Sequence, residues 1–163
     1  MDEAAFAVFH AATYRPLWAY VRRAAGDAAL ADDVVQDTFI RLLQARTDGL
    51  AAPQRKAYLY RIATNLLHDH WRRTRREVPE DEAGRDRAGP PPDASLDQGL
   101  DLAAALAHLP ERERAMVWLA HAEGYEHRDI AQMMNVGEKS VRVLLFRIRR
   151  KLAATLTAKE VER

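Results

Sequence analysis

The chain carries two neighbouring clusters of polar side chains whose opposite charges suit two different partners. The first lies in residues 28–46, where steps of three and four residues place these side chains on one helix face: Asp33, Gln36, Asp37, Ile40 and Gln44. Contact with water alone does not explain why the apolar Ile40 lies among carboxylates and amides. An apolar residue with a polar surround is typical of a protein-binding surface. The alternative is an ordinary solvated face with one stray isoleucine.

The second cluster is basic and aromatic and ends at Arg76. Residues 71–76 run Trp-Arg-Arg-Thr-Arg-Arg. Guanidinium groups offer forked donors to phosphate, and the flat rings of Trp71 and Tyr58 are surfaces on which an unstacked base can lie. The amide of Asn65, on the same predicted helix, can donate and accept against a base edge. A basic helix end also complements the helix dipole, but four arginines in five positions exceed that need. This cluster therefore predicts nucleic-acid binding.

A third group of residues lies toward the end of the chain. A short predicted helix over 128–134 is followed by a break at 135–137 and a long helix over 138–152, which ends in basic residues 147 and 149–151. Two helices joined by a tight turn are typical of a helix-turn-helix unit. These residues occupy packing positions: Ile130, Ala131, Val136, Val141, Leu145 and Ile148. Helical geometry points Val143 and Phe146 outward, together with Lys139 and Arg150.

The residues give little support to a metal site, a cofactor site or enzymatic activity. The His68-Asp69-His70 triplet suggests metal binding, but adjacent helix positions diverge by about 100°, so the three side chains do not converge easily on one ion. The chain has no cysteine and no Gly-rich phosphate loop. No pairing of a nucleophile with a base is evident. We therefore expect no metal site, no cofactor and no enzymatic activity.

Helical periodicity predicts the elements that position these clusters. The helix over 28–46 has this core-facing stripe: Val34, Val35, Thr38, Phe39, Leu42 and Leu43. The helix over 55–76 has a second stripe: Leu59, Ile62, Ala63, Leu66, Leu67 and His70. Pro16 suits the first turn of an earlier helix, which runs through Ala25 and ends at Gly26. No strand alternation appears, so we expect an all-α fold.

The composition changes between residues 77 and 99, where breakers and acidic residues replace apolar ones. Such a stretch cannot bury enough surface to order itself. We therefore predict two small helical domains, residues 1–77 and 99–163, joined by a flexible linker over 78–98. The second domain should begin with helices over 100–109 and 111–122, separated by Pro110.

Size and charge limit how these domains work. The 163 residues are 48% hydrophobic with a net charge of only +1, so nucleic-acid binding must come from locally segregated charge. No apolar run approaches the roughly 20 residues of a membrane span. The first residues, Met1-Asp2-Glu3, lack the pattern of a secretory signal. We expect an intracellular protein with no membrane contact of its own.

Three segments in order resemble the extracytoplasmic-function group of bacterial RNA polymerase sigma factors, over nearly the whole chain. Residues 32–42, DDVVQDTFIRL, resemble the segment that docks on the coiled coil of the polymerase's largest subunit. Residues 58–67, YLYRIATNLL, with the arginines after them, resemble the segment that opens and reads the minus-ten promoter element. Residues 106–114, LAHLPERER, with the helix-turn-helix, resemble the minus-thirty-five binding domain.

The resemblance implies roles for individual residues. Polymerase contacts fall to Asp33, Gln36, Asp37 and Ile40. Contacts to the minus-ten DNA fall to Tyr58, Arg61, Asn65, Asp69, Trp71, Arg72, Arg73, Arg75 and Arg76. Contacts to the minus-thirty-five DNA fall to Lys139, Ser140, Arg142, Val143, Arg147 and Arg150. The implied partners are core RNA polymerase, promoter DNA and an anti-sigma factor, and the implied location is the cytoplasm.

The second domain departs from the family pattern at two places. Glu126 and His127 stand where the family usually has a Ser or Thr N-cap. Val143 and Leu144 stand where the recognition helix usually presents small polar and basic residues. Val143 and Phe146 either touch thymine methyl groups or pack on a protein such as an anti-sigma factor, and the sequence leaves both open.

Three other binding functions compete with this interpretation. A sigma-like decoy would sequester an anti-sigma factor without binding promoters, but it should lose the basic and aromatic residues that this chain keeps. A stand-alone helix-turn-helix repressor leaves the acidic face of the first domain unexplained. A membrane-surface role needs a wide apolar face opposite the arginines, and the sequence offers none.

Overall fold

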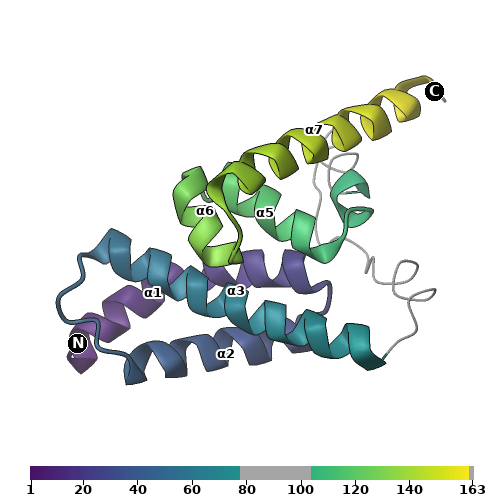
Figure 1. Cartoon of the computed structure of the whole chain (residues 1–163). Coiled ribbons are helices and arrows are strands. Elements are labelled where there is room, and N and C mark those ends of the chain that lie inside the picture. The colour runs from purple at the N-terminus through teal and green to yellow at the C-terminus, as the bar shows by residue number, and fades with distance from the viewer. Residues whose placement is uncertain (78–103, 162–163) are drawn as a thin grey trace.

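The computed structural model describes residues 1–77 and 104–161, and these contain helices and no strand (Figure 1). The helices are α1 (Glu3–Ala25), α2 (Ala28–Gln44), α3 (Ala52–Glu77), α5 (Glu111–His121), α6 (His127–Met134) and α7 (Glu138–Val161). The prediction of an all-helical fold is confirmed. The predicted linker over 78–98 lies outside the described residues, as does the start of the helix expected over 100–109, of which residues 104–107 are helical.

Helices α1, α2 and α3 pack on one another and form the first unit. Its core contains fully buried side chains from all three, among them Leu17, Leu42 and Leu67. The buried hydroxyl of Tyr20 on α1 lies 2.8 Å from that of Thr64 on α3, and Thr64 in turn donates to the Tyr60 carbonyl at 2.7 Å. These bonds satisfy polar groups that would otherwise be costly to bury.

The prediction that a helix begins near Pro16 is wrong, because α1 runs unbroken from Glu3 and encloses this proline. Asp2 caps the true start, where its carboxylate accepts a hydrogen bond from the Ala5 amide at 2.7 Å. An interior proline costs a helix about 3 kcal/mol. Apolar side chains on both sides of it, such as Phe9 and Leu17, are buried in the core, and this burial offsets the cost. The predicted end at Gly26 is confirmed by its left-handed φ of 73°.

Leu43 on α2 is also not where the periodicity predicted it. The rest of the predicted stripe is buried, but Leu43 is 54% exposed. It follows Ile40 by three positions and Gln36 by seven, so it shares their face of the helix and turns away from α1 and α3. His70 and Leu66 on α3, expected to be buried, are half-buried.

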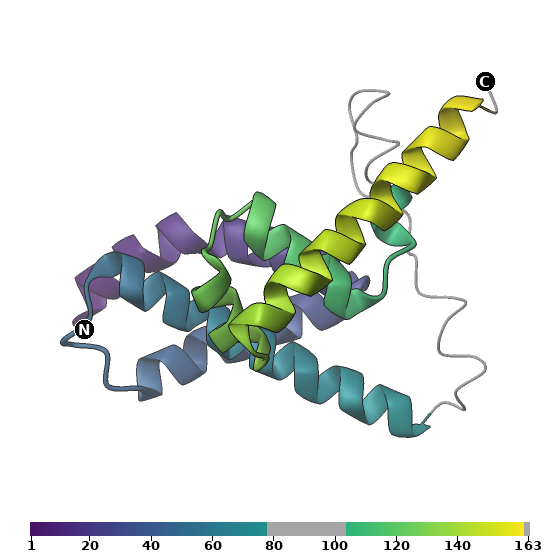
Figure 2. The same ribbon diagram turned by 45° about the horizontal axis from the view of Figure 1, so that its top comes forward.

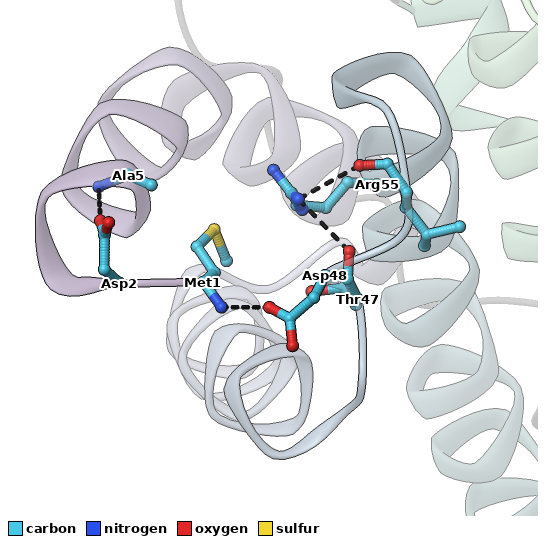
Figure 3. Close-up of polar contacts among 7 residues, drawn as sticks. Met1, Asp2, Ala5, Thr47, Asp48 and Arg55 are labelled. Carbon is cyan, nitrogen blue, oxygen red and sulfur yellow. Dashed lines mark hydrogen bonds and ion pairs between the residues drawn. The ribbon is translucent and has the colours of Figure 1, made fainter.

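Polar contacts to the backbone anchor the connection between α2 and α3 (Figure 3). The Arg55 guanidinium donates to the carbonyls of Thr47 at 3.3 Å and Leu50 at 3.2 Å. It also lies over the Phe9 ring, 5.8 Å from its centroid. The amino group of Met1 pairs with the Asp48 carboxylate in the same loop. These contacts fix the end of α2 relative to the start of α3. They therefore also fix the exposed carboxylates of α2 relative to the exposed arginines of α3.

Helices α5, α6 and α7 form the second unit, and α6 and α7 make the predicted helix-turn-helix. Asn135 ends α6 in the left-handed conformation, with φ 56°. The expected packing residues Ile130, Val141, Leu145 and Ile148 are buried. An ion pair between Lys151 and Glu113, at 2.9 Å, ties α7 to α5. Helix α7 continues to Val161, well past the predicted end at residue 152.

The two units pack against each other, α5 on α1 and α6 on α3 (Figures 1 and 2). Buried apolar residues of both units belong to one contiguous cluster. No helix in the described part of the chain is long and apolar enough to cross a bilayer.

Candidate nucleic-acid interface

The acidic face of α2, formed by Asp33, Gln36, Asp37 and Ile40, points away from the core. The core holds α2 in place behind this face, because the opposite side of the helix is buried. On that buried side the Thr38 hydroxyl donates to the Val34 carbonyl at 2.6 Å. Ile40 is 47% exposed. Asp37 pairs with Arg41 at 3.3 Å. This pair is exposed, so it contributes little to stability and leaves both groups available.

Leu43 extends this face and was missed as a functional candidate. It places a second exposed apolar side chain one helical turn from Ile40. The spacing of three residues was a usable signal, but the apolar character of Leu43 favoured a core position. Together the two side chains give the acidic face an apolar centre, which is the usual anatomy of a protein-binding surface.

Most of the predicted DNA-contacting residues of α3 lie on its exposed side. These are exposed: Arg61, Asn65, Asp69, Arg72, Arg73 and Arg75. Arg76 lies in the last turn of the helix. The Asp69 carboxylate pairs with Arg72, one turn later. This contact restrains the Arg72 guanidinium.

Tyr58 and Trp71 are placed differently from their neighbours on α3. Tyr58 is half-buried and packs on the core. Trp71 is only 5% exposed, and its ring lies 5.2 Å from that of His68. A stacking platform for a base must be open to solvent. In this arrangement the Trp71 ring is therefore not available as one.

A cleft of about 480 Å³ separates this part of α3 from the second unit. It is lined by Asn65, His68, Asp69, Trp71, Arg72 and Arg75 of α3, and by Arg112, Met134 and Asn135 of the second unit. Burial, with Arg112 and Arg72 nearby, lowers the pKa of His68 to about 4. The side chain is thus neutral at pH 7. Arg112 and Asn135 were not predicted at this site, because their approach to α3 depends on how the units pack.

The helix-turn-helix presents an exposed basic face on α7. All its predicted contact residues are exposed: Lys139, Ser140, Arg142, Val143, Arg147 and Arg150. Phe146 is 60% and Val143 48% exposed, as predicted, and the Arg150 guanidinium lies 5.9 Å from the Phe146 ring centroid. Glu126, at the N-cap of α6, makes no capping hydrogen bond. The exposed part of α7 thus combines positive charge with apolar surface.

Two family models match the chain, one over each unit. Residues 9–77 match "Sigma-70 region 2", and residues 99–152 match "Sigma-70, region 4". The acidic face and the exposed arginines of α3 fall in the first match. The exposed face of α7 falls in the second.

Curated relatives cover most of the chain. The extracytoplasmic-function (ECF) RNA polymerase sigma factor SigL of Mycobacterium tuberculosis is 35% identical over 146 residues, which span 86% of this chain and 82% of SigL. The ECF RNA polymerase sigma factor EcfG of Rhodopseudomonas palustris is 30% identical over 143 residues, or 86% of this chain and 78% of EcfG.

A solved structure shares the fold. The sigma factor RpoE of Bartonella quintana, crystallised in complex with the anti-sigma factor NepR, has a TM-score of 0.71 and 24% identity. The match covers 94% of this chain and 97% of that one.

Proposed function

This chain belongs to the extracytoplasmic-function family of RNA polymerase sigma factors, and from that premise we propose how its surfaces divide the work of a sigma factor. The chain binds core RNA polymerase and directs promoter recognition, strand opening and transcription initiation. The observation that carries this proposal is that two successive helices, fixed by one core, present an acidic face with an apolar centre and a row of exposed arginines.

The acidic face of α2 binds polymerase in this proposal. Ile40 supports it, because nearly half of this apolar side chain stays in contact with water in the free protein. A partner that covers Ile40 and Leu43 gains free energy from their burial. The surrounding carboxylates favour a basic counterpart and disfavour wrong partners.

Helix α3 opens the minus-ten element. An unstacked base costs a few kcal/mol, and stacking on an aromatic ring returns about 1–3 kcal/mol per base. Arg61, Arg72 and Arg73 hold the backbone, while Asn65 reads a base edge. Trp71 supplies the stacking surface once it is uncovered. The reaction is strand separation without covalent chemistry, in keeping with the non-catalytic character of sigma factors.

Helix α7 meets the minus-thirty-five element with Lys139, Ser140, Arg142, Val143, Arg147 and Arg150. Their exposure supports this assignment. The domains we propose are residues 1–77 and 99–163 with a linker over 78–98. The protein acts in the cytoplasm, where its polymerase is. RpoE of Bartonella quintana was crystallised with an anti-sigma factor, and we propose a partner of that class here.

Charge reversal on α2 tests the proposal. Asp33→Arg with Asp37→Arg should abolish binding to core polymerase and leave the helical circular-dichroism spectrum unchanged. The matched control reverses two exposed carboxylates outside α2, Glu3→Arg with Glu126→Arg, and should bind normally. Unchanged binding by the α2 variant refutes the assignment of the acidic face.

Run-off transcription with core polymerase on a genomic promoter pool tests the function itself. Specific transcripts are expected from the unaltered protein. If the chain binds polymerase without directing initiation, the proposed function is refuted. A chain that binds only an anti-sigma factor is the decoy considered above.

A further inference from the structure

The cleft between α3 and the second unit gathers positive charge from both units. Arg72 and Arg75 come from α3, and Arg112 comes from the first turn of α5. Asp69 supplies the one carboxylate among the described residues that line the cleft. Three guanidinium groups therefore face one carboxylate, and the lining keeps an excess of positive charge. Like charges gathered in this way repel one another, and an anion between them would relieve the repulsion.

Two of these arginines are not neutralised by a carboxylate. Within the described ranges, residues 1–77 and 104–161, neither Arg75 nor Arg112 forms an ion pair. Arg112 contacts the backbone instead, because its guanidinium donates to the Met134 carbonyl at 3.4 Å, at the end of α6. A carbonyl carries no net charge. This contact therefore holds the Arg112 guanidinium at the cleft and leaves its charge available to an anion.

The imidazole of His68, which also lines the cleft, responds to the charge of all three arginines. Burial is the main cause of its lowered pKa, and the positive charges of Arg112, Arg72 and Arg75 lower the pKa further, whereas Asp69 raises it. Among these charges that of Arg112 has the largest effect, although this residue belongs to the other unit. The guanidinium groups of the two units therefore act on the same small region of α3.

The size and the polar lining of the cleft suit a small organic anion. Its volume of about 480 Å³ lies in the range of about 300–1,000 Å³ that is typical of small-molecule sites. Guanidinium forks match the oxygens of a phosphate group. Asn65 of α3 and Asn135 of the second unit add two exposed amides to the lining. An amide both donates and accepts hydrogen bonds, as the edge of a nucleotide base requires.

We propose that this cleft binds a nucleotide, with the phosphate held by the three arginines and the base near Asn65 and Asn135. Both units contribute to the site. Arg112 and Asn135 belong to neither set of proposed promoter contacts, so the site extends beyond the minus-ten surface. Asn65, Arg72 and Arg75 do belong to that surface. If the proposed function holds, a bound nucleotide therefore competes with promoter DNA for α3.

Calorimetric titration of the whole chain measures nucleotide binding without polymerase or DNA. The probes are the 5′-monophosphates of adenosine, guanosine, cytidine and uridine, with ribose 5-phosphate and inorganic phosphate for comparison. At least one nucleotide should bind more tightly than ribose 5-phosphate, because only a nucleotide offers a base to the two amides. If none of the four nucleotides binds, the proposal is overturned. Equal affinity for inorganic phosphate and for every nucleotide shows an adventitious ion only, and also overturns it.

Substitution of Arg112 tests whether the second unit contributes to the site. Arg112→Gln should weaken nucleotide binding about ten- to hundredfold, because a charge-assisted hydrogen bond is lost. Arg112→Lys keeps the charge without the fork and should bind with intermediate affinity. The matched control is Arg128→Gln, the same change at an exposed arginine of α6 that does not line the cleft, and it should bind like the parent. Equal affinity of Arg112→Gln and Arg128→Gln overturns the proposal.

Asn135→Gly covers the case in which the Arg112 variants do not fold. Asn135 has a left-handed φ of 56°, and glycine adopts this conformation readily, so α6 should still end at the same position. The substitution removes one of the two amides. It should weaken the binding of the preferred nucleotide and leave that of ribose 5-phosphate unchanged. Unchanged binding of the nucleotide refutes the assignment of its base to Asn135.

Nuclear magnetic resonance of His68 determines where the nucleotide binds. A phosphate group beside the three arginines should raise the pKa of His68 from its value of about 4 in the free protein. A pKa of His68 that does not change in the nucleotide-bound protein places the ligand elsewhere and overturns the proposal.

A fluorescent single-stranded oligonucleotide distinguishes the nucleotide site from the DNA-binding surface. Arg112→Gln should leave the affinity for the oligonucleotide nearly unchanged, because Arg112 is not among the proposed promoter contacts. If this variant loses affinity for the oligonucleotide as much as for the nucleotide, the cleft is part of the DNA-binding surface and the proposal is overturned. Run-off transcription tests the sigma activity separately, so failure of the nucleotide site and failure of the proposed function can be told apart.

Discussion

Leu42 and Leu43 are adjacent in α2 but differ in environment, so truncation of each should affect a different property. Leu42 is fully buried, whereas Leu43 is 54% exposed beside Ile40. Full burial of a leucine side chain is worth about 1.5–3 kcal/mol, and about half of the Leu43 surface remains for a partner to cover. Since alanine keeps the Cβ atom, we expect Leu43→Ala to weaken polymerase binding about three- to tenfold.

Leu42→Ala should instead destabilise the fold. Truncation of a buried leucine costs about 2–5 kcal/mol, which lowers the melting temperature of a chain of this size by about 5–15 °C. Leu43→Ala should leave that temperature within about 1 °C of the parent, because it removes few core contacts. Thermal denaturation and fluorescence anisotropy with core polymerase measure the two properties. A Leu43→Ala protein that melts like Leu42→Ala, or that binds polymerase at full affinity, refutes the placement of Leu43 on the polymerase-binding face.

Two further predictions concern α3. The double substitution Arg72→Ala with Arg73→Ala should reduce promoter opening more than it reduces the affinity for polymerase. Permanganate footprinting measures promoter opening. Equal losses of opening and of affinity contradict the division of roles between α2 and α3. The lowered pKa of His68, about 4 against 6.5 in an unfolded chain, means that the unfolded state takes up the proton first as pH falls, so stability present above pH 6.5 is lost toward pH 4. After allowance for its partial exposure we expect a loss of about 1 kcal/mol between pH 7 and pH 5. The melting temperature of His68→Gln should show a smaller pH dependence over this range, and an equal dependence removes His68 as the cause.

The helices were predictable from sequence because apolar residues at helical spacing must face a core. Most of the predicted stripe of α2 is buried as expected. The predictions were wrong where the preference of one residue competed with the packing of the whole helix. Pro16 favours the first turn of a helix, but burial on both sides of it keeps α1 continuous. Leu43 is apolar enough for a core, yet its position on the helix turns it outward.

The candidate surfaces were predictable where they depend on a single helix. The exposure of Ile40, Val143 and Phe146 follows from helical geometry within one element. The burial of Trp71 also fits this geometry, because Trp71 follows the buried Leu67 by four positions on α3. The contact between Tyr60 and Glu123 does not follow from it, because that contact joins residues far apart in the chain and depends on how the two units pack. Periodicity contains no information about that packing. The roles of the individual side chains in polymerase and promoter binding remain predictions.

The apolar cluster shared by the two units also affects how quickly the protein is degraded. Small helical units bury a modest fraction of their surface and are only marginally stable alone. Here each unit supplies apolar neighbours to the other. A protease that cuts only loosened chains meets fewer susceptible molecules while the units stay together. The contacts between the units would thus protect the protein from turnover for as long as the units stay packed.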